Sequence, residues 1–159
     1  YALIDPVVIY AGPVGRLAGH EPHMAAVYRA QAAPAIMEEI WAAGDIGPGR
    51  LAVMERVAGP GVRLLSRAGD TPCGAAFVGV DGEVAMIHAI EVLAGFRRRG
   101  AGRLLIEGAA RFAAEAGADW LALAVTEANA PARALYDRLG MAEAGHYHYR
   151  IAPEAPERS

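Results

Sequence analysis

The strongest constraint on the fold is the order of the apolar runs around one glycine-rich segment. Three strand-like runs, 62–67, 73–80 and 83–93, are separated by tight turns at Gly69-Asp70 and Asp81-Gly82. Because such pairs between apolar runs are strong hairpin signals, the three runs are predicted to form an antiparallel meander. The glycine-rich segment follows the meander directly, and an unbroken helix follows that segment.

The other elements are predicted from periodicity and from turn residues. The helix after the glycine-rich segment runs from about 100 to 116 and ends at Gly117, where glycine suits a C-cap. The remaining predictions are strands over 1–11, 120–126 and from 141 toward 151, and helices over 22–43 (interrupted near Pro34), 50–57 and 129–139. A length of 159 residues fits one compact domain. This order of helices and strands predicts a mixed α/β (α+β) domain, with a mostly antiparallel sheet flanked by helices.

Composition excludes several classes of protein. The chain has no lysine, so all 15 basic residues are arginine, which is typical of a GC-rich bacterial genome. A net charge of −3 gives no overall case for nucleic-acid binding. No apolar run approaches the roughly 20 residues that cross a bilayer, so no membrane partner is expected. Cys73 is the only cysteine, so no internal disulfide can form, and a cytoplasmic location is the simplest expectation.

The chemistry is concentrated in the segment 96–105, which reads F-R-R-R-G-A-G-R-L-L between a strand and a helix. A helix N-terminus offers unpaired N–H groups, and glycines at 100 and 102 let an anion approach them. A Walker loop needs a lysine, and a dinucleotide fingerprint needs glycine where this chain has Leu105. The residues therefore indicate a phosphate or pyrophosphate site of another kind. The alternative is a basic turn whose glycines only ease the chain into the helix.

Two motifs resemble one known family, the GCN5-related N-acetyltransferases. Arg97, Gly100 and Gly102 occupy the fixed positions of its signature [QR]-x-x-G-x-[GA], although Ala94 stands where the family usually has proline. The segment 129–141 resembles the family's N-x-x-A-x-x-L-Y-x-x-x-G-[FM] motif. The resemblance covers about 62–150 and is weak before that.

The resemblance implies a fold and a co-substrate, acetyl-CoA. Strands 83–93 and 120–126 would splay apart, and pantetheine would lie between them like an extra strand. The N–H groups of Leu93 and of 98–103 would then contact pantetheine and pyrophosphate. The implied cofactor-binding residues are Ile90, Val92, Leu93, Arg97, Arg98, Arg99, Gly100, Ala101, Gly102, Arg103 and Asn129.

Three residues are candidates for catalysis. Tyr136, in the second motif, is the candidate general acid for the leaving thiolate; the alternative is a helix aromatic packed on the sheet. His88 and Glu91 are the candidate bases. Because they are three residues apart, a regular strand would place them on opposite faces, so at most one would face the slot unless a bulge intervenes. A buried, hydrogen-bonded His88 and an Asn129 that only caps its helix are the alternatives for those residues.

The C-terminal strand carries His146, Tyr147, His148 and Tyr149, and alternation predicts both histidines on one face and both tyrosines on the other. No third ligand accompanies the histidines, so no metal site is expected. Packing or a pocket wall is the better interpretation of this run.

The predicted function is transfer of an acetyl group from acetyl-CoA to a primary amine by direct attack. The alternative is a non-catalytic acyl-CoA-binding or regulatory module. A protein that binds nucleic acid through its arginine loop is a poor third hypothesis. The net charge of the chain is negative, and no aromatic residues alternate with the arginines of the loop. The acceptor, a small-molecule or peptide amine, stays open, as does a homodimer.

The first strand suggests one further hypothesis. Residues 1–13 can be laid over 141–153 without a gap, with identity at Ala2/Ala142 and Pro13/Pro153. Since the chain does not begin with Met, residues 1–13 would on this hypothesis be the last strand of an upstream acetyltransferase-like half, and 62–152 the core of this one.

Overall fold

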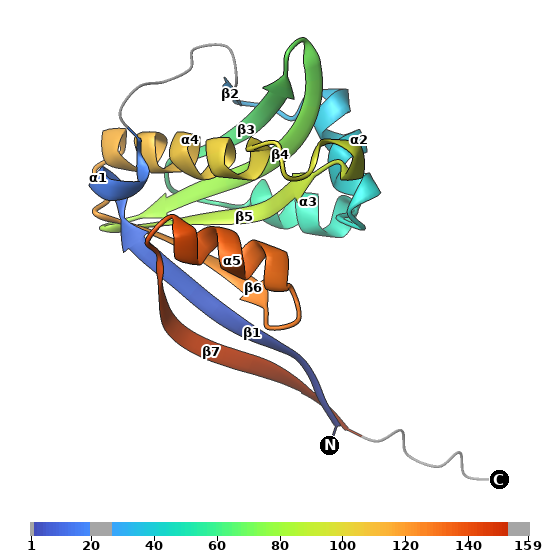
Figure 1. Ribbon diagram of the computed structural model, residues 1–159, viewed down its shortest axis with the longest axis vertical. Helices are drawn as coiled ribbons and strands as arrows, with labels where there is room; N and C mark the ends of the chain where they lie inside the picture. The colour runs from blue at the N-terminus through green and yellow to red at the C-terminus, as the bar shows by residue number, and fades with distance from the viewer. Residues whose placement is uncertain (1, 20–26, 153–159) are drawn as a thin grey trace, which may run out of the picture.

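The computed structural model describes residues 2–19 and 27–152, which form one seven-stranded sheet with helices on both faces (Figure 1). The strand order is β2-β3-β4-β5-β6-β1-β7, and every neighbouring pair is antiparallel except β5 with β6. The strands are β1 (Ala2–Pro13), β2 (Val27–Ala30), β3 (Gly61–Ala68), β4 (Thr71–Asp81), β5 (Val84–Val92), β6 (Trp120–Thr126) and β7 (Ala142–Ile151).

The helices divide between the two faces of this sheet. The helices are α1 (Val14–Leu17), α2 (Ala35–Ala43), α3 (Pro48–Met54), α4 (Ala101–Glu115) and α5 (Ala130–Arg138). Side chains of α1, α4 and α5 share one core with the sheet, and side chains of α2 and α3 share a second core on the opposite face. The mixed α/β architecture predicted from the sequence is confirmed.

The meander and the long helix are confirmed. Strands β3, β4 and β5 pair antiparallel in sequence order, and the two turns between them place Gly69 and Gly82 at φ of 58° and 57°. Helix α4 buries Leu105, Ile106 and Ala109 completely. Gly117 follows it at a φ of 87°, the left-handed conformation that glycine adopts at low cost.

Strand β1 lies inside the sheet, between β6 and β7, although its sequence predicted only that it is a strand. It is antiparallel to both neighbours, with Val8 opposite Val125 on one side and His146 on the other. Val8 and Tyr10 are almost completely buried. The first strand of the chain therefore joins the C-terminal half of the fold.

Two predicted helices were wrong in extent. Within the predicted helix 22–43, residues 27–30 form strand β2 on β3, and α2 begins only after Pro34; residues 22–26 lie outside the described part. The alanine-rich composition favoured helix, but the proline stops a helix from passing through. The predicted helix 50–57 is α3, which starts earlier, with Pro48 in its first turn, and ends at Met54. A short 3₁₀ segment, Ala94–Phe96, was not predicted.

The two central strands separate, as the family resemblance implied. Strands β5 and β6 pair in parallel only from Val84 to Ile87 and from Trp120 to Leu123. Strand β5 continues to Val92 and β6 to Thr126 without pairing with each other. A split between them thus opens toward their carboxyl ends, next to the start of α4.

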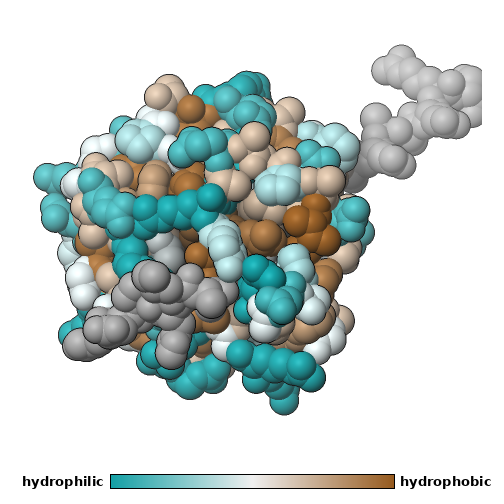
Figure 2. Space-filling view, turned by 90° about the horizontal axis from the view of Figure 1, so that it is seen from above, coloured by the Kyte–Doolittle hydropathy of each residue, from teal (hydrophilic) through white to brown (hydrophobic). Residues whose placement is uncertain are grey.

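The face of the molecule seen from above is mixed in character. Seen from above, the visible apolar side chains are divided into small groups by hydrophilic ones (Figure 2). Among the helices described, none is long and apolar enough to cross a membrane.

Candidate functional site

The arginine-glycine loop (residues 97–103) lies at the mouth of the split between β5 and β6 and presents free N–H groups. Leu104 makes the first backbone bond of α4, donating to the carbonyl of Gly100. In the part of the chain that the structure describes, none of the N–H groups of 98–103 donates to another backbone group. Gly100 has a φ of 83°, and Arg98, unusually for a residue with a side chain, has a φ of 62°. Such turns gather N–H groups into an anion-binding concavity.

Space and charge at the loop suit a phosphate. A Cβ at Gly100 would meet no atom within 4 Å, so the backbone there is open. Leu93 is less available than predicted, because its N–H donates to the carbonyl of Cys73 at 2.8 Å. Arg99 lies over the ring of Phe96, with its guanidinium carbon 5.8 Å from the ring centre.

Arg97 connects the loop to the end of β5. Its Nε donates to the carbonyl of Val92 at 3.1 Å, and its Nη2 donates to Oε1 of Glu91 at 3.3 Å. The side chain of Glu91 is 17% exposed, and a methyl group at Gly44 would collide with its carboxylate. The loop, the end of β5 and the turn after α2 therefore meet at one carboxylate.

A β-bulge in β5 changes which side chains share a face. His88 pairs with Phe77 and Glu91 with Ala75, so β5 has one residue more than β4 in this interval. Ala89 takes up the extra length with a φ of 51°, and its carbonyl accepts a hydrogen bond from Nε1 of Trp41 at 2.9 Å.

The bulge turns both candidate bases to one side of the sheet. Since Phe77 and Ala75 are two residues apart, they share a face, and their partners His88 and Glu91 share it as well. This is the face covered by α2 and α3. The exception allowed for in the sequence analysis, a bulge, is present.

His88 is half-buried, with its ring centre 6.3 Å from that of Phe77. Burial and, to a smaller extent, the positive charge of Arg50 on α3 lower the pKa of His88. Its imidazole is therefore neutral at pH 7, the state that accepts a proton.

Tyr136 is a residue of α5, on the opposite face of the sheet from His88 and Glu91, and its ring is buried in the core there. It is 5% exposed, and its ring centre is 5.5 Å from that of Tyr10. Burial, with a smaller contribution from Tyr10, raises the pKa of Tyr136 to about 12. The hydroxyl is thus protonated and able to donate a hydrogen bond at any ordinary pH.

Asn129 caps α5: its Oδ1 accepts a hydrogen bond from the N–H of Ala132 at 3.3 Å. This capping bond is enough to explain an asparagine at position 129, with no need for a contact to a ligand.

The faces predicted for the C-terminal strand agree with its contacts. Tyr147 and Tyr149 pack edge to face with centres 5.7 Å apart, whereas His146 lies 3.4 Å from Glu143 and 3.7 Å from Glu127. His20 and His23 lie outside the described residues. Over 2–19 and 27–152, no three His, Cys, Asp or Glu side chains form a group suited to a metal ion.

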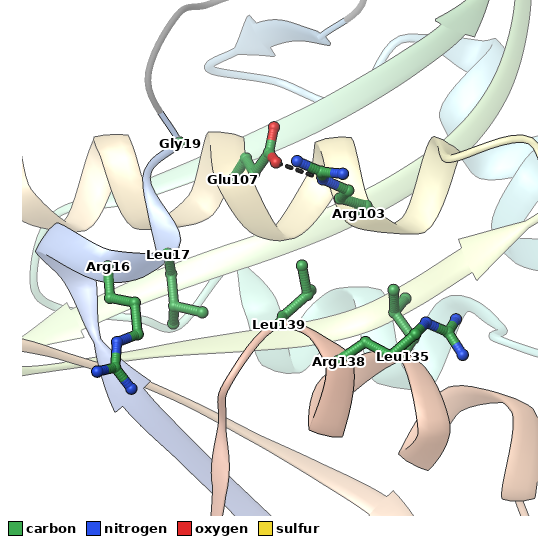
Figure 3. A pocket seen from close by; sticks show the side chains of 8 residues that line it. All are labelled: Arg16, Leu17, Gly19, Arg103, Glu107, Leu135, Arg138 and Leu139. Atoms are coloured by element: carbon green, nitrogen blue, oxygen red, sulfur yellow. Dashed lines mark hydrogen bonds and ion pairs between the residues drawn. The ribbon is translucent and has the colours of Figure 1, made fainter.

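A groove of about 370 Å³ lies between α1, α4 and α5, beside the arginine-glycine loop (Figure 3). Three arginines border it, one from each helix, and Glu107 forms an ion pair with one of them, Arg103, at 2.7 Å. The lining residues are Arg16, Leu17, Gly19, Arg103, Glu107, Leu135, Arg138 and Leu139.

Sequence reasoning missed the residues that support the site. Trp41, Gly44 and Arg50 come from α2, from the turn after it and from α3, where the pattern indicated only a core-facing helix. The arginine-glycine loop could be recognised from the sequence because its glycines, arginines and helix start are adjacent in the chain. The contacts of these three residues depend on tertiary packing.

Comparison with known proteins gives a consistent result. The sequence profile of the Acetyltransferase (GNAT) family matches residues 36–141. A streptothricin acetyltransferase of Streptomyces lavendulae is 51% identical over 59 residues, which are 37% of this chain and 31% of that protein.

Solved structures agree with the profile. A GCN5-related N-acetyltransferase from Kribbella flavida superposes with a TM-score of 0.65 at 25% identity, covering 92% of this chain and 58% of that one. A GNAT acetyltransferase from Elizabethkingia anophelis with acetyl-CoA bound has a TM-score of 0.61 at 17% identity, covering 70% of this chain and 72% of that one. The chain thus spans less than two thirds of the Streptomyces and Kribbella proteins.

Proposed function

The chain belongs to the GNAT acetyltransferase family, and on that basis we propose that it transfers an acetyl group from acetyl-CoA to a primary amine by direct attack. The observation that supports this most strongly is the set of unpaired N–H groups of 98–103 at the mouth of the split between β5 and β6.

The residues of the chain fit acetyl-CoA as co-substrate. The N–H groups of the loop and the start of α4 would hold the pyrophosphate, and the arginines there raise the positive potential. The part of β5 that does not pair with β6, near Ile90 and Val92, would hold pantetheine between the two strands. A backbone N–H in this split would polarise the thioester carbonyl.

Proton movements are assigned to the two faces of the sheet. The acceptor amine must be neutral when its nitrogen forms the new bond to the acyl carbon, so His88 or Glu91 takes its proton, directly or through water. As the carbon–sulfur bond breaks, negative charge develops on sulfur. Tyr136 donates a hydrogen bond to that sulfur. With its pKa at about 12, well above the roughly 8.5 of a thiol, stabilising the thiolate is easier for it than transferring the proton completely.

The first experiment is calorimetric titration of acetyl-CoA into the protein and into Gly100→Glu. The carboxylate in this variant would occupy the anion seat, and a side chain at a φ of 83° adds strain. We expect binding to the unmodified protein and loss of at least about tenfold in affinity in the variant. If acetyl-CoA does not bind the unmodified protein, the proposal fails. Circular dichroism of the variant checks that it is folded.

Turnover separates the enzyme from a binding module. Tyr136→Phe removes one hydroxyl from a packed ring, so we expect kcat to fall about 10²–10⁴-fold, with acetyl-CoA affinity within about twofold. Release of the free thiol reports the rate.

Because the matched relative is a streptothricin acetyltransferase, streptothricin is the first acceptor to test, followed by amino acids, polyamines and peptides. Cofactor binding without turnover on any of these amines would favour the non-catalytic module.

A further inference from the structure

The candidate general acid, Tyr136, shares a contact partner with another residue of its own helix. Tyr136 and Arg133 are three residues apart on α5, so their side chains lie on the same side of that helix. Both reach Tyr10 of β1, in the core between α5 and the sheet (Figure 1). The ring of Tyr10 lies 5.5 Å from that of Tyr136, and the hydroxyl oxygen of Tyr10 accepts a hydrogen bond from Nε of Arg133 at 3.4 Å. Tyr10 is 1% exposed, so it is a fixed neighbour for both side chains.

Arg133 is itself held by three parts of the fold. Its Nε donates to Tyr10 on β1, its Nη1 to the carbonyl of Glu127 after β6 at 3.3 Å, and its Nη2 to Oε1 of Glu143 on β7 at 2.9 Å. A guanidinium is planar and rigid, so bonds from all three of its nitrogens leave it a single orientation. The Arg133 side chain therefore fixes the position of the Tyr10 hydroxyl.

A bulge in β7 brings Glu143 to this side of the sheet. Tyr10 pairs with Glu143 and Val8 with His146, so β7 has one residue more than β1 in this interval. Since Val8 and Tyr10 are two residues apart and share a face, their partners Glu143 and His146 share it as well. This is the face covered by α5, where Glu143 meets Arg133 and lies 3.4 Å from His146.

We propose that Arg133 is a positioning residue for acetyl transfer: it fixes Tyr10, and the ring of Tyr10 in turn holds Tyr136 in the orientation that serves the leaving thiolate. The inference rests on the proposed function, in which Tyr136 donates a hydrogen bond to the sulfur. Arg133 and Tyr10 act only through Tyr136. Because misplacement of a reacting group by about 1 Å can cost on the order of 10²-fold in rate, a loosened support should lower kcat with little effect on the KM for acetyl-CoA.

The experiment makes Arg133→Gln and Tyr10→Phe in the unmodified protein and again in Tyr136→Phe. Thiol release gives kcat and KM, with streptothricin or the amine of highest turnover as acceptor. In the unmodified protein we expect each substitution to lower kcat about five- to twentyfold, with KM within about twofold. In Tyr136→Phe the same substitutions should lower kcat less than about twofold, because no hydroxyl remains to be positioned. Tyr10→Phe keeps the packed ring, so it tests the hydrogen bond without a gap in the core.

The matched control is Arg29→Gln, at the other edge of the sheet. Arg29 donates to both carboxylate oxygens of Glu115, at 2.6 and 2.9 Å, and its guanidinium lies over the ring of Phe112. It thus combines an ion pair with an aromatic contact, as Arg133 does, but has no connection to Tyr136. Its kcat should stay within about twofold of the unmodified protein. Urea midpoints of all variants separate a loss of stability from a loss of rate.

The possible failures are distinct. An unchanged kcat in Arg133→Gln, or an equal loss with and without the hydroxyl of Tyr136, overturns this inference and leaves the acetyltransferase proposal intact. A raised KM for acetyl-CoA with unchanged kcat would assign Arg133 to cofactor binding and also overturns it. If Tyr136→Phe keeps full activity, or if no amine is acetylated, the proposed function fails in that part, and this inference fails with it.

Discussion

At the scale of single residues, Glu91 has two competing roles. It is a candidate base for the acceptor amine, and it also accepts a hydrogen bond from Arg97, whose guanidinium belongs to the loop that we propose binds the cofactor. Replacing Glu91 by Gln should free that positive charge for the pyrophosphate. We expect acetyl-CoA to bind about two- to fivefold more tightly to Glu91→Gln at low salt, with the gain shrinking as salt screens the loop. Calorimetry at two ionic strengths measures this.

His88→Gln is the control for that prediction, because it removes the other candidate base from the same face without touching Arg97. Its cofactor affinity should equal that of the unmodified protein. Weaker cofactor binding in Glu91→Gln would mean that the carboxylate supports the loop rather than competing for it. The variant with the greater loss of kcat identifies the base.

His88 also gives the stability of the protein a dependence on pH. Its pKa is lowered in the folded state, so between that value and its unfolded value near 6.5 the unfolded chain binds more protons. Stability is therefore present above about pH 6.5 and is lost as the pH falls toward the folded-state pKa. We expect the urea midpoint of the unmodified protein to fall more between pH 7.5 and pH 5.5 than that of His88→Gln. Parallel curves would contradict this role.

At the scale of elements, α2 holds the bulge of β5 through Trp41. Trp41→Phe keeps a ring in the core but leaves the carbonyl of Ala89 without its donor. We expect a loss of about 1–3 kcal/mol in the free energy of unfolding, and a larger effect on kcat than on cofactor affinity, because His88 and Glu91 flank the bulge. Trp120→Phe is the control, since that ring is 47% exposed. Equal effects in the two variants would show that the hydrogen bond is unimportant.

The elements also show what could be predicted from the sequence. The meander, α4 and α5 follow from local signals: paired turn residues, helical spacing and caps such as Gly117 and Asn129. Strand β2 could not be predicted, because four residues in an alanine-rich stretch become a strand only through their pairing with β3. The position of the bulge could not be predicted either: alanine disfavours a φ of 51°, and the hydrogen bond from Trp41 spans 48 residues.

Within the candidate site the same division holds. The N–H groups of the loop follow from glycines next to a helix start, so their position was predictable. The shared face of His88 and Glu91 was not, because strict alternation places them on opposite faces. The buried state of Tyr136 depends on Tyr10 and on the placement of β1, which no local pattern indicated.

At the scale of the whole molecule, β1 is an internal strand that links β6 to β7. It pairs with β6 on one side and β7 on the other, so an N–H from its middle meets a carbonyl whichever way it points. We expect Val8→Pro to destabilise the protein by about 3 kcal/mol or more, measured by chemical denaturation. Leu3→Pro is the control, because Leu3 is 56% exposed and pairs only with β7. A native-like midpoint in Val8→Pro would contradict the internal position of the strand.

The upstream half stays a prediction. Strand β1 completes the sheet of this fold, a role open to a strand that also ends a preceding half or to one that simply starts this one. Sequencing the coding region before Tyr1 tests the hypothesis. A second acetyltransferase-like motif there would support it, and a start codon at or just before Tyr1 would end it.

The internal position of β1 has a consequence for biosynthesis. A ribosome makes residues 2–13 well before the two strands that pair with them, because both of those strands lie after residue 119. At roughly 5–20 residues per second, an apolar strand with two open edges waits on the order of 5 to 20 seconds before its partners emerge. During that time its two open edges can pair with a neighbouring polypeptide. Slow translation of the C-terminal half would therefore lower the yield of native protein, and a chaperone that holds the first strand would raise it.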